Sequence, residues 1–207
     1  MHGRLLFAAV FLASIFAGCA EKGPILLTPA YQMPVEKPGT IPIVSVGVSP
    51  FKDGRAHAPS AIGTRLIPSG LKNDFVVQGT VAEVASKALK NALTARGIAV
   101  KDGAAWDLTT EGMKADGIAL LLGGEIKTLW LESKASSFNT HVNASVQLRI
   151  VVGDGLEKKI IRTIEVSSTL DQEVLYSRER LENILSEALT SAIDQIFKDD
   201  EMKKRLQ

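Results

Sequence analysis

The stretch from residue 142 to residue 170 reads VNASVQLRIVVGDGLEKKIIRTIEVSSTL, and it decides the fold class. In its first half, apolar side chains alternate with Asn, Ser, Gln and Arg, which is the two-residue period of a strand with one face toward a core. Gly153-Asp154-Gly155 is then a strong hairpin turn, and residues 159–170 return as a second strand. The stretch therefore predicts a long antiparallel hairpin.

Two amphipathic helices are expected on either side of this hairpin in the sequence. Thr80-Val81-Ala82-Glu83 fits a capping box, and apolar residues including Leu89 follow at helical spacing up to Gly97. A second helix is expected after Ser177, with Leu185 on its apolar stripe. Helices separated by antiparallel hairpins predict an α+β fold, in which two long amphipathic helices pack on one face of a mostly antiparallel sheet.

The remaining elements are less strongly marked. The long apolar run of residues 118–132 predicts a strand, and Gly123-Gly124 within it predicts a bulge or bend. The mixed acids and bases at the C-terminus predict a frayed, solvated helix end over residues 198–207. Weaker patterns predict a strand at 41–51, a short edge strand at 62–67, loops at 52–60 and 69–74, and a brief helix at 107–115.

The first residues indicate an export signal that ends in a lipid attachment site. Arg4 precedes Leu5–Phe16, a mostly apolar run of twelve residues, which suits a secretory signal and is too short to span a bilayer. The segment IFAGC that ends at Cys19 resembles the bacterial lipobox, although Phe16 stands where that pattern prefers Leu. The resemblance implies a signal peptide over residues 1–18, cleaved before a lipidated Cys19. A plain secretory signal with a chance cysteine is the alternative.

The lipid on Cys19 would make the membrane a partner, because two or more acyl chains anchor a protein stably. Ala20 follows the cysteine, at the position where an Asp favours inner-membrane retention in the enteric lipoproteins that this segment resembles. That resemblance implies the outer membrane, with the domain on its periplasmic face. Cys19 is the only cysteine, so no disulfide within the chain is possible.

Residues 19–40 predict a lipidated, proline-rich tether, because four of the eight prolines lie between residues 21 and 40. The tether is expected to add little to the core, but Ile25-Leu26-Leu27 and Tyr31 leave open that it docks on the domain as an edge segment. Residues 41–207 predict a single α+β periplasmic domain. Without Arg4 the mature chain has 23 basic and 23 acidic residues, which argues against nucleic acid as a partner.

No catalytic or cofactor motif is found in the sequence. His57 and His141 have no second ligand at metal-binding spacing, so neither a metal site nor a cofactor is expected. Glu125 and Glu132 share a predicted strand, and alternation puts them on opposite faces unless a bulge intervenes, so a pair of catalytic acids is the weaker alternative. The sequence predicts a protein that is not an enzyme.

The order of these elements after a lipidated cysteine resembles the YajG-type family of bacterial lipoproteins. The residues that carry the resemblance are ILLTPAYQMP at 25–34, ALKNALTARGIAV at 88–100 and the C-terminal helix. These are largely packing patterns, and the family is uncharacterised. The resemblance therefore implies a location and a fold rather than an activity.

Arg65, Lys72 and Trp130 are the candidate partner-binding residues. Arg65 and Lys72 lie in the loop-rich segment before the first helix, and loops on rigid scaffolds carry recognition. Leu129 and Trp130 are neighbours on a strand, so one of them faces away from the core, unless the tether buries Trp130. The leading hypothesis is a non-enzymatic, lipid-anchored accessory domain that binds another envelope protein. The second is a periplasmic binding module for a small apolar ligand or lipid.

Overall fold

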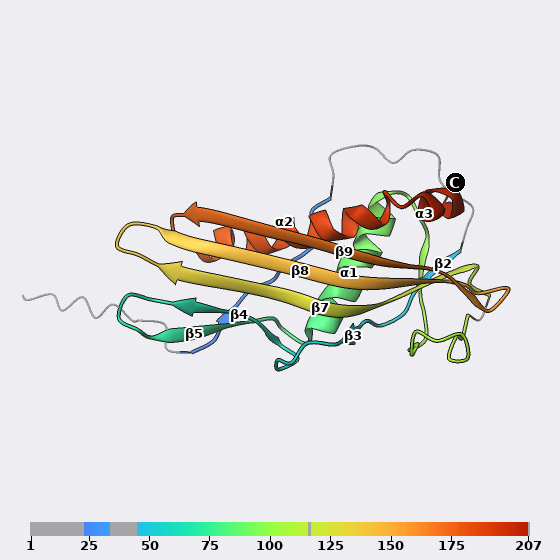
Figure 1. Ribbon diagram of the computed structural model, residues 1–207, viewed down its shortest axis with the longest axis horizontal. Helices are drawn as coiled ribbons and strands as arrows, with labels where there is room; N and C mark the ends of the chain where they lie inside the picture. Colours follow the sequence, from blue (N-terminus) through green and yellow to red (C-terminus); the bar gives the residue numbers. More distant parts are fainter. Residues whose placement is uncertain (1–22, 34–44, 116, 207) are drawn as a thin grey trace, which may run out of the picture.

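Three long antiparallel strands run along most of the molecule (Figure 1). The computed structural model describes residues 23–33, 45–115 and 117–206. The hairpin predicted between residues 142 and 170 is confirmed, and its turn occupies residues 155–158. The three strands are β7 (Leu120–Ala135), β8 (Thr140–Asp154) and β9 (Lys159–Val174).

The other edge of β7 pairs with three short strands in succession, and all three run parallel to it. They are β2 (Val46–Val48), β3 (Lys52–Asp53) and β4 (Ala61–Leu66). In the described part of the chain, further pairing builds these strands into one nine-stranded sheet. The strands that complete it are β1 (Ile25–Leu26), β5 (Lys72–Val76) and β6 (Val100–Asp102).

The sheet is mixed, which corrects the prediction of a mostly antiparallel one. The β4–β5, β7–β8 and β8–β9 pairs are antiparallel, whereas β1–β5, β2–β6 and the three short strands along β7 are parallel. Helix α1 (Val81–Ala95) lies in the sequence between β2, β3 and β4 and their partner β7, and such a crossover is what parallel pairing requires. Side-chain alternation identifies a strand but not the direction of its partner.

Two of the short strands also differ from expectation. β4 lies between β5 and β7, so it is not an edge strand. β5 occupies residues 72–76, where the sequence predicted a loop up to residue 74. Its sequence KNDFV begins with three polar residues, which do not show the pattern of a strand. Phe75 is its only fully buried side chain.

The described residues form three helices rather than two long ones: α1, α2 (Arg178–Ile196) and α3 (Asp200–Leu206), of 15, 19 and 7 residues. The predicted N-terminal caps are confirmed. Thr80 and Glu83 form the capping box of α1, and Ser177 accepts a hydrogen bond from the Arg180 amide at 3.1 Å. Gly97 follows α1 with φ of 78°, a conformation that favours glycine.

The C-terminal tail is a separate helix and not a frayed end, because it has its own cap and its own buried residue. The Asp199 carboxylate accepts hydrogen bonds from the amides of Glu201 and Met202. Met202 is buried in the main core. Two apolar residues, Met202 and Leu206, among charged neighbours gave too weak a pattern to predict this.

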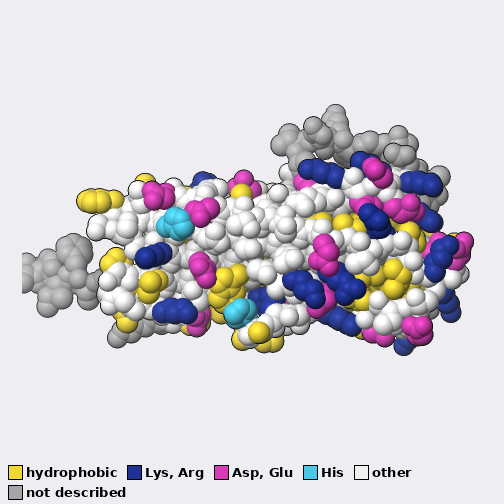
Figure 2. All heavy atoms as spheres, in the orientation of Figure 1, with side chains coloured by type: hydrophobic (Ala, Val, Ile, Leu, Met, Phe, Trp, Pro, Cys, Tyr) yellow, Lys and Arg dark blue, Asp and Glu magenta, His cyan; other side chains and the backbone are white. Residues whose placement is uncertain are grey.

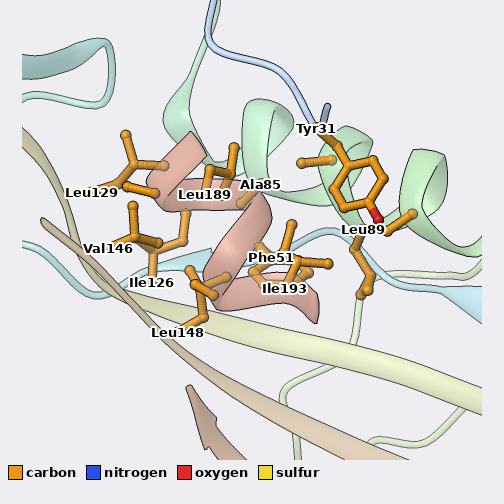
Figure 3. Packing of buried hydrophobic residues seen from close by; sticks show 14 of the residues in the cluster. Tyr31, Phe51, Ala85, Leu89, Ile126, Leu129, Val146, Leu148, Leu189 and Ile193 are labelled. Carbon is orange, nitrogen blue, oxygen red and sulfur yellow. The ribbon is translucent and has the colours of Figure 1, made fainter. Parts of the chain in front are cut away.

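The main core lies between the sheet and the helices α1 and α2. Leu89 and Leu185 are fully buried there, so the predicted apolar stripes are confirmed. Figure 3 shows side chains of α1 and α2 packed against residues of the sheet that include Ile126, Leu129, Val146 and Leu148.

A smaller core covers part of the opposite face of the sheet. Residues 107–115, predicted as a brief helix, form turns instead, and Trp106 donates from Nε1 to the Thr109 carbonyl at 2.6 Å. The loop that contains them covers the sheet with apolar side chains. Its members are Trp106, Met113, Ala115 and Ile118, packed on Leu121 and Val151.

Gly123 and Gly124 do not form the predicted bulge. The pairing with β8 is regular there, and the register shifts instead between Ile126 and Thr128. A Cβ on Gly123 would lie 2.7 Å from the Trp106 ring, and one on Gly124 would lie 2.4 Å from the ring of Phe51. The two glycines therefore allow aromatic rings to approach β7 closely on both faces.

The N-terminal segment of residues 23–33 is docked on the domain. β1 pairs in parallel with β5, and Ile25, Leu27 and Tyr31 are buried in the main core. Of the two roles left open for this segment, the structure shows the docked one. Residues of the 23–33 segment thus contribute to the core, contrary to expectation. Cys19, the export segment and the rest of the predicted tether lie outside the described residues.

Candidate functional site

Trp130 lies on the face of the sheet opposite α1 and α2. Leu129 is fully buried in the main core, so its neighbour Trp130 points the other way, where it is half-buried. The imidazole of His57 stacks on the indole, with ring centroids 4.1 Å apart and planes at 17°. A groove of about 590 Å³ adjoins this stack, and other residues that line it are Thr128, Asn143 and Ser145.

The surroundings of the stack are mostly polar. Figure 2 shows this face, on which the middle of the long strands carries few charged or hydrophobic side chains. The pairing register of β7, β8 and β9 explains why the surroundings are polar. Trp130 pairs with Ser145, and Ser145 pairs with Thr169, so these side chains lie on the same face. The half-exposed indole is thus a large apolar group among side chains that can form hydrogen bonds.

A buried arginine fixes the loop that carries His57. The Arg55 side chain is 2% exposed and makes two 2.8 Å hydrogen bonds to the carboxylate of Asp53. It also donates to the carbonyl oxygens of Ala61 at 2.7 Å and Leu129 at 3.1 Å. The hydrogen bonds from Arg55 lower the pKa of Asp53 although the carboxylate is partly buried. Because Leu129 precedes Trp130, the arginine ties the loop to the strand beside the stack.

Arg65 and Lys72 lie elsewhere. Arg65 is on β4, within the strand predicted at 62–67, and Lys72 is on β5 rather than in the predicted loop. The guanidinium carbon of Arg65 lies 3.5 Å from the centre of the Tyr176 ring. Arg65 pairs with the buried Ser133, which puts it on the helix side of the sheet, away from Trp130. Lys72 is exposed at the start of β5. The structure therefore does not bring the three candidate residues into one site.

The register shift in β7 puts Glu125 and Glu132 on the same face. Glu125 contacts Lys127 at 2.7 Å and Arg149 at 3.7 Å. The hydrogen bond from Lys127 lowers the pKa of Glu125, whereas a general acid requires a raised pKa. The surroundings of Glu125 are those of an ion pair on a sheet surface.

A second arrangement, which the sequence did not predict, holds the N-terminal segment on α2. Alternate backbone amides of the segment donate to side chains one helical turn apart. Two extended residues advance about 6.6 Å and four helical residues about 6 Å, so the two repeats stay in step over three bonds. The pairs are Thr28 to Glu182 at 3.1 Å, Ala30 to Ser186 at 3.1 Å and Gln32 to Thr190 at 2.9 Å.

Tyr31 joins this segment to α1 and α2. Its hydroxyl donates to Asp194 of α2 at 2.8 Å and accepts from Arg96 at the end of α1, also at 2.8 Å. Arg96 in turn contacts Asp194 at 2.8 Å. Burial raises the pKa of the Tyr31 phenol, so the hydroxyl remains a donor at neutral pH. Tyr31 and Arg96 both lie in stretches that carry the family resemblance, but no sequence pattern pairs residues this far apart.

A shallow groove of about 250 Å³ lies between the docked segment and α1. Its apolar lining includes Leu27, Val84 and Ala88. Among the described residues, no group of three or more His, Cys, Asp or Glu side chains is placed to hold a metal ion. His141 contacts the carboxylate of Asp171 at 2.6 Å. Within the described ranges, no helix has the length and apolar character needed to cross a membrane.

A family model described as uncharacterised lipoproteins, Lipoprotein_16, matches residues 78–207, and the chain belongs to that family. This confirms the resemblance to YajG-type lipoproteins. Membership indicates a membrane-anchored protein of the cell envelope. A search of curated proteins finds no match.

Solved structures resemble the fold with little sequence identity. Protein XCC0632 from Xanthomonas campestris is 10% identical, with 87% of this chain and 98% of that one covered and a TM-score of 0.54. A protein from Helicobacter pylori described as a neuraminyllactose-binding hemagglutinin homologue is 12% identical over 88% of this chain and 96% of that one, with a TM-score of 0.44. At 10% identity, the similarity to XCC0632 shows a shared fold alone.

Proposed function

We propose that the protein is an outer-membrane lipoprotein, anchored by lipid on Cys19 with its domain in the periplasm, and that it binds another envelope protein as a non-enzymatic accessory. The lipobox-like segment before Cys19 and the family membership support the anchor. The balanced charge of the mature chain and the absence of a catalytic motif in the sequence favour a binding role.

The observation that carries partner binding is the stack of Trp130 on His57. Trp is enriched among the residues that contribute most to protein interfaces, typically where a neighbouring groove accepts side chains of the partner. Here the indole is half-buried beside a groove of about 590 Å³. Arg55 holds the loop in place, so the site is rigid before a partner arrives.

The test is crosslinking in cells that express the full-length protein, followed by mass spectrometry to name its neighbours. We expect Trp130→Ala to abolish a specific crosslinked partner while membrane fractionation and cooperative unfolding persist. Lys87→Glu serves as a control variant, because Lys87 is exposed on α1, on the other side of the sheet. If the same partner is captured by the Trp130→Ala protein in its folded state, this face is not the binding site.

Binding of a small apolar ligand or lipid is the second candidate. The observation in its favour is the apolar lining of the groove between the docked segment and α1. Its volume of about 250 Å³ lies below the usual range of ligand pockets, which begins at about 300 Å³. Extraction of the purified protein followed by lipid mass spectrometry tests this role, and a stoichiometric bound lipid other than the anchor would favour it.

A further inference from the structure

Five exposed apolar side chains gather at one end of the sheet and form what we call the apolar tip. Pairing of Leu66 with Lys134 and of Thr140 with Val174 brings the ends of β4, β7, β8 and β9 together. This is the left end of Figure 1, where hydrophobic side chains reach the surface in Figure 2. The apolar tip consists of Leu66 (42% exposed), Leu71 (59%), Phe138 (89%), Leu175 (76%) and Tyr176 (37%).

The structure around the tip holds these side chains outward. Phe138 lies in the turn between β7 and β8, which is closed by hydrogen bonds from the amide and hydroxyl of Ser136 to the Asn139 carbonyl at 2.8 and 2.9 Å. Tyr176 is stacked on the Arg65 guanidinium. Large apolar side chains clustered on turns expose area that a soluble monomer usually buries, and such clusters mark contacts with proteins or membranes.

The position of the N-terminal segment favours a membrane, rather than a protein, as the contact of the tip. The carbonyl of Gly23 accepts a hydrogen bond from the side chain of Asn73. Asn73 is the second residue of β5, next to Lys72, just after the tip. Cys19 precedes Gly23 by four residues, which span at most about 14 Å when fully extended. A lipid on Cys19 would therefore hold this end of the domain, and not the other, at the bilayer surface.

We propose that the apolar tip is a second membrane contact, inserted at the bilayer surface beside the lipid anchor. The proposal rests on the lipidation of Cys19 in the proposed function. Lys72 and Lys134 are exposed at the same end, where their ammonium groups can reach phospholipid phosphates while their stems lie along apolar surface. Anchor and tip together fix the orientation of the domain, with the far end of the sheet pointing away from the membrane.

This orientation suits partner binding at the stack of Trp130 on His57. Trp130 precedes the end of β7 by five residues, or about 17 Å of strand. The groove beside Trp130 would then stand clear of the lipid headgroups and remain open to another envelope protein.

The experiment uses the lipidated full-length protein in vesicles of phosphatidylethanolamine and phosphatidylglycerol. Because Cys19 is the only cysteine and its sulfur would carry lipid, a second cysteine is a unique site for an environment-sensitive fluorophore. Labels are placed through Phe138→Cys and Leu71→Cys, with Leu156→Cys as the matched control. Leu156 is apolar and 74% exposed, but it lies in the turn between β8 and β9 at the opposite end of the sheet. Spin-labelled acyl chains in the bilayer serve as the quencher.

We expect the labels at 138 and 71 to lose fluorescence to the quencher and the label at 156 to keep it. Phe138→Ser and Leu175→Ser in the Leu71→Cys protein should weaken that quenching without changing its unfolding transition, because both side chains are largely exposed. A protein that floats with the vesicles but shows equal quenching at all three positions, or none, refutes the tip contact alone. Failure to float, with no lipid found on the Cys19 peptide, refutes the anchor itself. Capture of a protein by a photoreactive residue at 138, without quenching in vesicles, would make the tip a protein interface and also refute the proposal.

Discussion

Replacement of Leu27 by Ala tests whether the N-terminal segment is part of the fold. Leu27 is fully buried in the main core, and its amide donates to the Val76 carbonyl at 2.8 Å. Truncation of a buried Leu to Ala costs about 2–5 kcal/mol of unfolding free energy. Leu27 also lines the groove beside α1, so its neighbours can relax and we expect about 2–3 kcal/mol, the lower part of that range.

The assay is urea unfolding of the mature chain with Cys19→Ser, which removes the lipid acceptor from the wild type and variant alike. With a slope of about 2 kcal/mol per molar urea, the loss corresponds to a fall in midpoint of roughly 1 M. Met33→Ala is the matched control, because Met33 belongs to the same segment but is 72% exposed. The control should leave the midpoint unchanged.

A second variant tests the hydrogen bonds between the segment and α2. Ser186→Ala removes the acceptor of the Ala30 amide. The bond is part-buried and Ala30 is exposed, so water can replace the acceptor and we expect a loss of about 0.5–1.5 kcal/mol. The reasoning is refuted if Leu27→Ala and Ser186→Ala both unfold at the urea concentration of the wild type. The segment would then be a tether that contributes nothing to the stability of the domain.

Three further predictions concern the core, the acid response and the anchor. Leu89→Ala and Leu185→Ala should each cost about 2–5 kcal/mol in the same urea assay, and losses under about 1 kcal/mol at both would mean that the helix faces are wrongly assigned. Hydrogen bonds from Arg55 lower the folded-state pKa of Asp53, so their stabilisation is present above its ordinary value of 3.8 and lost as the pH falls through the lower folded value. Asp53→Asn should therefore be less stable at pH 7 and lose less stability in acid than the wild type, and an unchanged acid profile would contradict this. Cys19→Ser should release a folded protein from the membrane fraction of cells, and complete retention there would show that lipid is not the main attachment.

Local patterns predicted the elements whose cause is local. The hairpin of β8 and β9 follows from alternation in β8 and the turn residues after it, and the cap of α1 follows from Thr80 and Glu83, three positions apart. The cap at Ser177 follows from the apolar stripe that begins after it. Local patterns do not predict the direction of strand pairing, because that direction depends on the path of the chain through α1. The helix of the C-terminal tail was likewise missed, since only the buried Met202 and the partly buried Leu206 pack it against the core.

The candidate site was predictable only in part. Neighbouring Leu129 and Trp130 required that one face away from the core, and the structure shows that it is Trp130. Its stacking partner His57 lies 73 residues earlier, and nothing in the sequence links the two. Lys72 was assigned to a loop, whereas pairing with β4 makes its segment a strand. Arg65 was assigned to a short edge strand, and pairing with both β5 and β7 makes that strand an interior one. Contacts across the sheet depend on register, which a single sequence does not reveal.

Site-specific photocrosslinking in cells tests the central claim of partner binding most directly. A photoreactive residue replaces Ser145, which pairs with Trp130 on the helix-free face, and a control replaces Lys87, which is exposed on α1. Both are introduced into the full-length protein with Cys19 intact. We predict that the residue at 145 captures one defined envelope protein, that Trp130→Ala abolishes the capture, and that the residue at 87 does not capture that protein. Capture of the same protein from 87 and not from 145, or from neither position, would contradict partner binding at this face.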